Sequence, residues 1–269
     1  MTVTKNVLKK VTIVIVCLFA LVGIVAVGGF IAIRFGWTNG ASIVDSKDRF
    51  LQNPQDPAWT NTPEWKTLSK AAAADAPTIN KVASETGVPA RLIVTQLVVE
   101  QLRLYNTDRE IFKKIFEPLQ ILGVQSQFSW GVMGIKQDTA IAVEQHLIDS
   151  SLPWYLGKDF EHALDFKTAD HDTERFDRLT DDHNHYYSYL YTGLYLKEIM
   201  TQWKNAGFDI SARPEILSTL YNIGFVHSKP NTNPSSGGAV ITVGNKTYSF
   251  GELAAQFYYS NALISEFPR

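Results

Sequence analysis

The sequence predicts a mainly α-helical domain with one small β-hairpin near its C-terminus, preceded by a single transmembrane helix. Residues 11–33 carry no charged side chain and are long enough to cross a hydrocarbon core of about 30 Å. From residue 64 onward, the apolar residues recur mostly with helical spacing. Gly244-Asn245, a two-residue hairpin signal, separates two short segments of β-prone residues.

Composition and charge exclude several classes of protein. The 269 residues are 45% hydrophobic and 19% charged, which is typical of a globular chain and not of a disordered one. The net charge is −2, but residues 1–34 carry +4, so the remainder carries −6. A mildly acidic body does not favour nucleic-acid binding. Cys17 is the only cysteine, which excludes an intramolecular disulfide and zinc sites built from several cysteines.

The apolar run at the N-terminus determines the predicted location. Lys5, Lys9 and Lys10 precede it and only Arg34 closely follows, so the N-terminus is expected to stay in the cytoplasm. A long signal peptide that is cleaved off is the alternative, although such peptides have shorter apolar regions. The single-pass prediction divides the chain into a cytoplasmic N-terminus (1–10), a transmembrane anchor (11–33), a tether (34–63) and an extracytoplasmic domain (64–269).

Capping signals place the elements of this domain. Thr62-Pro63 offers an N-cap and a first-turn proline for a helix through residues 71–74. Gly87 closes a second helix over residues 77–85. Helical spacing then predicts helices over residues 89–105, 138–148, 185–205 and 213–223.

The C-terminal region combines a hairpin with a last helix. Residues 240–243 and 246–250 are predicted to pair across the Gly244-Asn245 turn. The capping box Ser249-x-x-Glu252 opens a final helix that is predicted to reach about Ile264.

One acid lies on an apolar face of the helix predicted over residues 89–105. Glu100 shares a narrow stripe with three aliphatic residues, Ile93, Leu97 and Leu104. A carboxyl group enclosed there is expected to resist ionisation, as a general acid at a glycosidic bond must. Two other interpretations stay open: Glu100 is buried and paired with Arg103 or Arg109, or the stripe faces water.

Three further segments resemble motifs of lytic transglycosylases and goose-type lysozymes. Residues 129–140, SWGVMGIKQDTA, resemble the Gly-Leu-Met-Gln-Ile-x-Pro-x-Thr-Ala stretch of that family. Residues 189–196, YLYTGLYL, resemble its Asn-Ile-x-x-Gly-x-x-Tyr-Leu helix, and residues 220–224, LYNIG, its Ala-Tyr-Asn-x-Gly motif. Glu100 stands where the catalytic Glu of the family stands, and the four features follow in the family order.

The resemblance implies a lysozyme-like fold and cleavage of peptidoglycan between N-acetylmuramic acid and N-acetylglucosamine. Ordinary glycosidases use two carboxyl groups. The transglycosylase route needs only Glu100, because the 6-hydroxyl of the sugar itself attacks and closes a 1,6-anhydro ring. No metal and no organic cofactor is implied. The expected partners are peptidoglycan glycan strands and, through the N-terminal helix, the cytoplasmic membrane.

The motifs also suggest substrate-binding residues. Gly131 would allow close approach of the backbone to a sugar, and Met133 would form an apolar wall beside the acid. Tyr221 and Asn222 would bind the N-acetyl group or orient Glu100. Ser129 would replace the serine that the family usually has beside its catalytic Glu. Ordinary packing roles remain the alternative for Met133, Tyr221 and Asn222.

Departures from the family pattern support a second functional hypothesis. Gln101 stands where the family has the serine, Gly134 where it has a glutamine, and Tyr189 where it has an asparagine. Residues 106–127 form an apparent insertion. The alternative function is therefore a non-catalytic lysozyme-fold module that binds glycan or acts as a scaffold in a cell-envelope complex.

The acidic and histidine-rich stretch 170–185 is a separate feature. His183-x-His185 with neighbouring aspartates could coordinate a divalent cation. Its spacing matches no firm metal-site pattern, and a solvated charged loop is the favoured interpretation.

Overall fold

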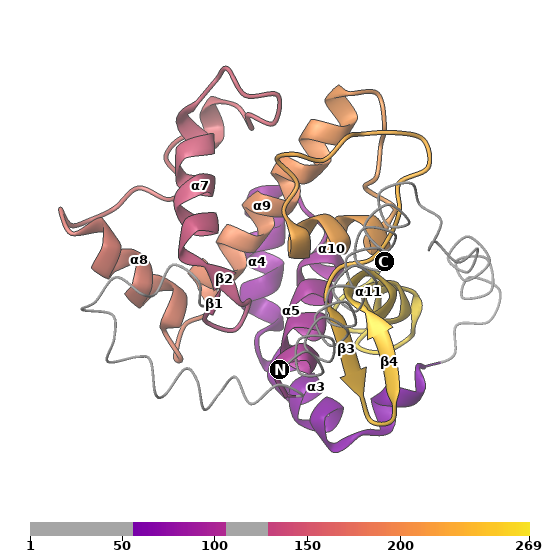
Figure 1. Cartoon of the computed structure of the whole chain (residues 1–269). Helices are drawn as coiled ribbons and strands as arrows, with labels where there is room; N and C mark the ends of the chain where they lie inside the picture. The colour runs from indigo at the N-terminus through magenta and orange to yellow at the C-terminus, as the bar shows by residue number, and fades with distance from the viewer. Residues whose placement is uncertain (1–55, 106–128) are drawn as a thin grey trace, which may run out of the picture. The chain divides into compact units, whose positions relative to one another are not determined.

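The computed structural model describes residues 56–105 and 129–269, which all belong to one compact unit of the chain, Ile43–Arg269. As predicted, these residues form a mainly helical fold; it contains two small antiparallel ribbons, of which the one near the C-terminus was predicted (Figure 1). The helices are α3 (Pro63–Ala74), α4 (Ala76–Thr86), α5 (Ala90–Tyr105), α7 (Gln137–Ile148), α8 (His171–Thr180), α9 (Tyr186–Asn205), α10 (Pro214–Ile223) and α11 (Phe250–Tyr259). Two short 3₁₀ helices, Ala58–Asn61 and Lys158–Phe160, complete the helical elements of the described residues.

The predicted cytoplasmic N-terminus (1–10), anchor (11–33) and most of the tether (34–63) lie outside the described residues. None of the helices that the structure describes combines the length and the apolar character that a membrane span needs. The last part of the predicted tether is packed on the domain. Trp59 is buried there, and its indole Nε1 donates a hydrogen bond to Oε1 of Gln256 on α11 at 3.0 Å.

Local capping explains where several helices begin and end. The side chain of Thr62 accepts a hydrogen bond from the backbone N–H of Trp65, which caps α3 as predicted. Gly87 ends α4 in the left-handed conformation, with φ +71°. The side chain of Ser249 caps α11 by accepting from the N–H of Glu252.

Helix α5 is enclosed by the rest of the domain. It packs against helices α3, α4, α9, α10 and α11 and against strand β3 (Val240–Val243). Its sequence allows this because apolar residues occur on most of its circumference, and Leu92, Ile93, Val94 and Val98 are fully buried. A helix that is apolar on nearly all sides is stable only inside a core, which explains its central place.

The two ribbons are short. Strand β3 pairs with β4 (Lys246–Ser249), and Val243 lies opposite Lys246 across the predicted turn. Strands β1 (Ser129–Trp130) and β2 (Ile135–Lys136) were not predicted; they enclose the glycine-rich turn of the 129–140 segment.

Two further features differ from the predictions. The charged stretch that was expected to be a loop contains α8, whose N-cap Asp170 accepts a hydrogen bond from the N–H of Thr173 at 3.1 Å. The last helix was predicted to reach about Ile264 but ends at Tyr259. The backbone becomes extended at Ser260, whose hydroxyl donates to the carbonyl of Phe257. Arg91 binds the backbone carbonyl groups at and beyond that helix end.

Arg91 lies at the first turn of α5 and is fully buried. Its guanidinium donates five hydrogen bonds of 2.8–3.1 Å to the carbonyl oxygens of Phe257, Tyr258, Ser260, Ala262 and Phe267. Burial, with the positive charge of Arg269 nearby, lowers the pKa of Arg91 to about 10, so the side chain stays protonated at neutral pH. Arg91 thus satisfies, together with Arg269 and the hydroxyl of Ser260, the carbonyl groups that the end of α11 leaves without helical partners.

Replacing Arg91 tests this arrangement. Arg91→Met removes five hydrogen bonds inside the core and leaves the carbonyl oxygens of Ala262 and Phe267 without another donor among the described residues, so we expect the free energy of unfolding to fall by about 3–5 kcal/mol. Denaturant titration measures the loss. Arg269→Met is the control, because this exposed arginine binds carbonyl groups of the same turn. A loss from Arg91→Met no larger than that of the control would contradict the role of Arg91.

Candidate active site

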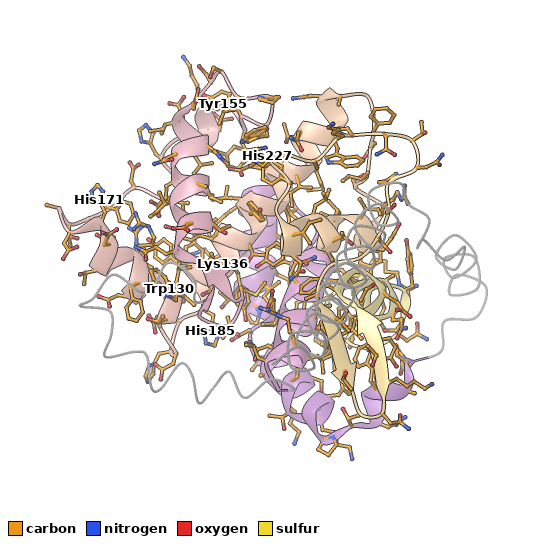
Figure 2. All side chains as sticks on the ribbon, in the orientation of Figure 1. Trp130, Lys136, Tyr155, His171, His185 and His227 are labelled. Atoms are coloured by element: carbon orange, nitrogen blue, oxygen red, sulfur yellow. The ribbon has the colours of Figure 1, made fainter. Side chains whose placement is uncertain are left out.

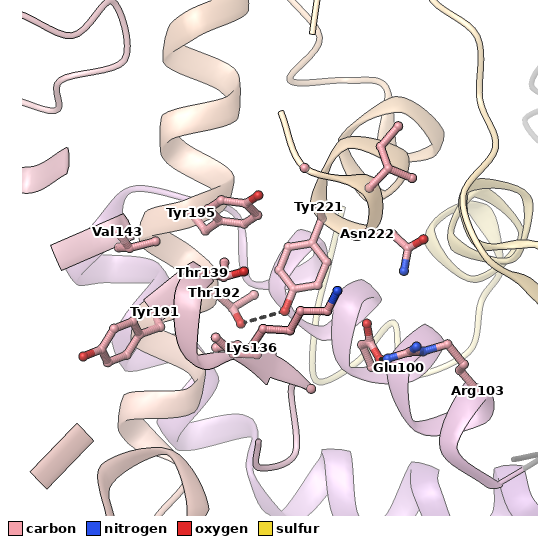
Figure 3. A pocket seen from close by; sticks show the side chains of 14 residues that line it. Glu100, Arg103, Lys136, Thr139, Val143, Tyr191, Thr192, Tyr195, Tyr221 and Asn222 are labelled. Atoms are coloured by element: carbon pink, nitrogen blue, oxygen red, sulfur yellow. Dashed lines mark hydrogen bonds and ion pairs between the residues drawn. The ribbon is translucent and has the colours of Figure 1, made fainter. Parts of the chain in front are cut away.

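A pocket of about 190 Å³ lies where α5, strand β2, α7, α9 and α10 meet (Figure 3). Four features singled out in the sequence converge on it: Glu100, the 129–140 segment, the tyrosine-rich helix α9 and the end of α10. The described residues that line it are Glu100, Arg103, Gly134, Ile135, Lys136, Thr139, Val143, Tyr191, Thr192, Tyr195, Tyr221, Asn222, Ile223 and Gly224.

Glu100 is both buried and part of the pocket wall. Its exposed fraction is 3%. Arg103, one turn further along α5, donates to the same carboxylate oxygen Oε2 from Nε at 2.9 Å and from Nη2 at 2.5 Å. The pairing that the sequence left open is thus made by Arg103, while Arg109 lies outside the described residues. A guanidinium in contact favours the ionised form of a carboxyl group.

The backbone of Gly134 lies close to the carboxylate of Glu100. Its φ is +61°, and a Cβ atom added there would lie 2.8 Å from Oε2 of Glu100. The backbone therefore approaches Glu100 as closely as only glycine allows. The departure from the family pattern at this position has a structural reason: a side chain at 134 would occupy the place of the carboxylate.

Tyr221 joins three walls of the pocket. Its hydroxyl donates to the backbone carbonyl of Met133 at 3.0 Å and lies 3.3 Å from Oγ1 of Thr192 on α9. Burial and the negative charge of Glu100 raise the pKa of Tyr221 well above its ordinary value. The side chain therefore stays a neutral phenol beside the acid.

Asn222 has a fixed orientation. Its Oδ1 accepts a hydrogen bond from the backbone N–H of Ala239 at 2.8 Å, and only the carbonyl end of an amide can do so. This bond turns the NH₂ group of Asn222 toward the side of the pocket where Glu100 lies (Figure 3). Asn222 is thus placed to donate to a bound molecule, while its oxygen holds the loop before β3.

The other three predicted residues lie outside this lining. Met133 is fully buried, and its carbonyl, not its side chain, contributes by anchoring Tyr221. Gly131, at φ +61°, faces the backbone of α8, since an added Cβ would lie 1.8 Å from the carbonyl oxygen of Leu179. Ser129 begins β1 opposite Lys136.

The structure therefore brings Glu100, Tyr221 and Asn222 together in the pocket. Gly131 and Met133 shape the turn beside it.

Gln101, the second departure from the family pattern, also supports this turn. Its Nε2 donates to the carbonyl oxygen of Val132 at 2.6 Å. The side chain next to Glu100 in sequence therefore ties α5 to the turn that carries Gly134.

The sequence analysis missed several lining residues. Lys136 and Thr139 belong to the 129–140 segment that carried the resemblance, and Tyr191, Thr192 and Tyr195 to the tyrosine-rich helix. Their motifs were recognised, but helical spacing did not indicate which side chains of each motif face the pocket.

Tyr191 lines the pocket with its ring but directs its hydroxyl away from it. The hydroxyl donates to Oε1 of Glu144 at 2.5 Å. Arg175 neutralises Glu144 with two hydrogen bonds of 2.7 Å. Glu144 does not line the pocket, so among the described lining residues Glu100 is the single carboxylic acid.

A second buried acid lies behind the pocket wall. Glu198 on α9 is fully buried, and its Oε2 lies 3.0 Å from Nδ1 of His146 on α7. Its other oxygen has no hydrogen-bond partner among the described residues. Burial raises the pKa of Glu198 to about 7, although the contact with His146 opposes the shift.

The acidic and histidine-rich stretch does not gather into one site. Asp181, Asp182 and His183 form an exposed group whose ligand atoms lie within 4.8 Å of one another. His185 is directed elsewhere, with Nδ1 2.6 Å from Oδ2 of Asp75 at the junction of α3 and α4. The hydrogen bond to Asp75 raises the pKa of His185 above its ordinary value. Figure 2 shows His171 and His185 in separate parts of the domain.

Alanine at position 134 tests the close approach to Glu100. Gly134→Ala is expected to cost about 1–2 kcal/mol for its left-handed conformation and a further amount for displacing the carboxylate. Gly244→Ala is the matched control, because Gly244 has the same φ of +61° and nothing within 4 Å of an added Cβ. Urea unfolding of both variants compares the two losses. Equal losses would mean that Gly134 is not in steric contact with Glu100.

The pH dependence of stability tests the burial of Glu198. Because its pKa rises from 4.5 in the unfolded chain to about 7 in the fold, the folded state holds the proton more tightly. The contribution of Glu198 to the free energy of unfolding is fully present below pH 4.5. This contribution is lost as the pH rises from 4.5 to about 7. Glu198→Gln should therefore gain stability relative to the parent protein between pH 5 and pH 8, as measured by thermal melting. Asp159→Asn, at an exposed acid, is the control, and a difference independent of pH would refute the assignment.

Comparison of the chain with protein-family models found no match. Comparisons with curated proteins and with solved structures found none either. The geometry of the pocket and the motifs that converge there are therefore the features that bear on function.

Proposed function

We propose that this chain is a membrane-anchored lytic transglycosylase with a lysozyme-like fold, which cleaves the bond between N-acetylmuramic acid and N-acetylglucosamine in peptidoglycan. The observation that carries the proposal is the meeting of Glu100 with Tyr221 and Asn222 in one pocket. Glu100 is far in the sequence from the adjacent Tyr221 and Asn222, and the resemblance predicts all three as site residues.

The proposed reaction needs one carboxyl group. Protonated Glu100 gives its proton to the glycosidic oxygen while the bond from that oxygen to the sugar C1 breaks, leaving an oxocarbenium-like ring. The 6-hydroxyl oxygen of the same sugar then bonds to C1 and transfers its proton to the Glu100 carboxylate. The ring closes as a 1,6-anhydro sugar and the acid is restored. Intramolecular attack provides a nucleophile at high effective concentration, so a second protein carboxylate is unnecessary.

The neighbours of Glu100 have roles that fit this chemistry. The Asn222 amide N–H groups face the pocket and suit the carbonyl oxygen of an N-acetyl group. Tyr221, a neutral phenol held by Met133, fixes the distance between α10 and the turn beside the acid. Gly134 leaves room for the carboxylate itself.

Arg103 sets a condition on the mechanism. As long as its guanidinium contacts Oε2, the ionised form of Glu100 is favoured and proton donation is suppressed. The bound glycan must therefore draw Arg103 away from Oε2 before the acid can act. Arg103 is the less buried partner of the pair, with a side chain 19% exposed against 4% for Glu100, so it is the one that can move.

The same ion pair favours a second candidate function. If Arg103 keeps Glu100 ionised when glycan binds, the pocket acts as a non-catalytic glycan-binding or scaffold module of a cell-envelope complex. In both functions, the domain would be held outside the cytoplasmic membrane by residues 11–33.

Digestion of purified sacculi tests the proposed activity. The parent protein should release muropeptides with 1,6-anhydro ends, detected by mass spectrometry, and Glu100→Gln should lower the rate by about 10²–10⁴-fold. Glu252→Gln, at an exposed acid on α11, is the matched control and should keep full activity.

The products separate the alternatives. Reducing ends without anhydro ends would replace the transglycosylase by a hydrolytic lysozyme. Binding to sacculi without any product, unchanged by Glu100→Gln, would favour the non-catalytic module.

A further inference from the structure

The mouth of the pocket carries a lysine that the proposed reaction does not use. Lys136 is the last residue of β2 and directly precedes α7. The pairing of β1 with β2 fixes its backbone opposite Ser129. Ile135 beside it is buried, whereas Lys136 is exposed. Its side chain extends across the pocket in front of Tyr221, and its ammonium group lies on the side of Asn222 and Glu100 (Figure 3).

The two cations of the pocket differ in their contacts. Arg103 is bonded to Glu100. Among the hydrogen bonds and ion pairs of the described residues, none involves the ammonium group of Lys136. An ammonium group has three donors, and in a partly enclosed pocket they gain most from an anionic acceptor.

The charges of the described lining residues also favour an anionic ligand. The described lining residues contain one acid, Glu100, and two cations, Arg103 and Lys136. The described part of the lining is thus positive by one charge when Glu100 is ionised and by two when Glu100 is protonated for catalysis. The chain beyond residue 34 carries a net −6, so the positive sign of this lining differs from that of the remaining chain and favours an anionic ligand.

We propose that Lys136 is a specificity-determining residue that binds a carboxylate of the glycan substrate and selects acid-bearing strands over neutral ones. The proposal rests on the proposed function of the same pocket. Two carboxylate sources fit: the lactyl group of a muramic acid that carries no peptide, and the acidic groups of a peptide stem. A neutral strand of N-acetylglucosamine alone offers neither.

The test compares three kinds of soluble oligosaccharide. The first is a neutral oligomer of N-acetylglucosamine, the second a peptide-free alternating oligomer with free lactyl carboxylates, and the third the same oligomer with peptide stems. Binding is measured by calorimetry on full-length protein carrying Glu100→Gln, so that the result does not depend on turnover. Lys136→Met is compared with the charge-preserving Lys136→Arg and with Lys66→Met, at an exposed lysine on α3.

Loss of one charge-assisted hydrogen bond corresponds to roughly a ten- to hundredfold rise in Kd, and we expect that rise for Lys136→Met on acid-bearing oligomers only. Lys136→Arg should keep most of the affinity, and Lys66→Met all of it. A rise limited to the second oligomer identifies the lactyl group, and one limited to the third identifies the stem.

Equal weakening on neutral and acid-bearing oligomers, or no weakening on any of them, would overturn the assignment of Lys136. Failure of the proposed function looks different. In that case the protein without Glu100→Gln cleaves none of the three oligomers, while the charge selectivity of binding can still be measured.

Discussion

The enclosure of α5 by its neighbours is the constraint on which the rest of the domain depends. A helix packed against five others buries most of its side chains, so a buried charge on it needs a partner inside the fold. Arg91 meets this need at one end by binding five carbonyl groups, and Glu100 meets it near the other end by pairing with Arg103. The first contact connects the C-terminal segment to the core, and the second places a carboxylate beside a pocket.

The turn between β1 and β2 supplies the opposite wall of that pocket, and its contacts are mutually dependent. Gln101 binds the carbonyl of Val132, Tyr221 binds that of Met133, and Gly134 lies against the carboxylate of Glu100. Gln101 and Gly134 are two of the positions at which the chain departs from the motifs it resembles. The departures are therefore parts of one arrangement, in which the turn is held by α5 and α10 together.

In the proposed reaction, the charges around the pocket make the protonation of Glu100 depend on what is bound. Glu100 is the single acid among the described lining residues, and Arg103 favours its ionised form. A substrate that engages the guanidinium would release the carboxyl group to take up a proton. Lys136 adds a second positive charge at the mouth, so an acidic strand would be attracted to the same place where the Glu100–Arg103 pair has to separate.

The sequence alone determined the features that depend on nearest neighbours along the chain. Thr62, Gly87 and Ser249 set helix ends because their side chains or backbone conformations act within one turn. The two-residue turn predicted the hairpin. The place of Glu100 on an apolar stripe predicted that this acid is buried. Each of these signals lies within a few residues of the feature it specifies.

Only the tertiary structure decided the rest, because the determining contacts join residues far apart in the chain. Carbonyl groups at the end of helix α11 are bound by Arg91, which lies more than 160 residues away in the sequence. The approach of Gly134 to Glu100, and the place of Lys136 at the pocket mouth, likewise depend on how α5, β2 and α10 pack. Helical periodicity assigns a residue to a face of its own helix, but the neighbour that covers this face is fixed by the packing of the whole domain.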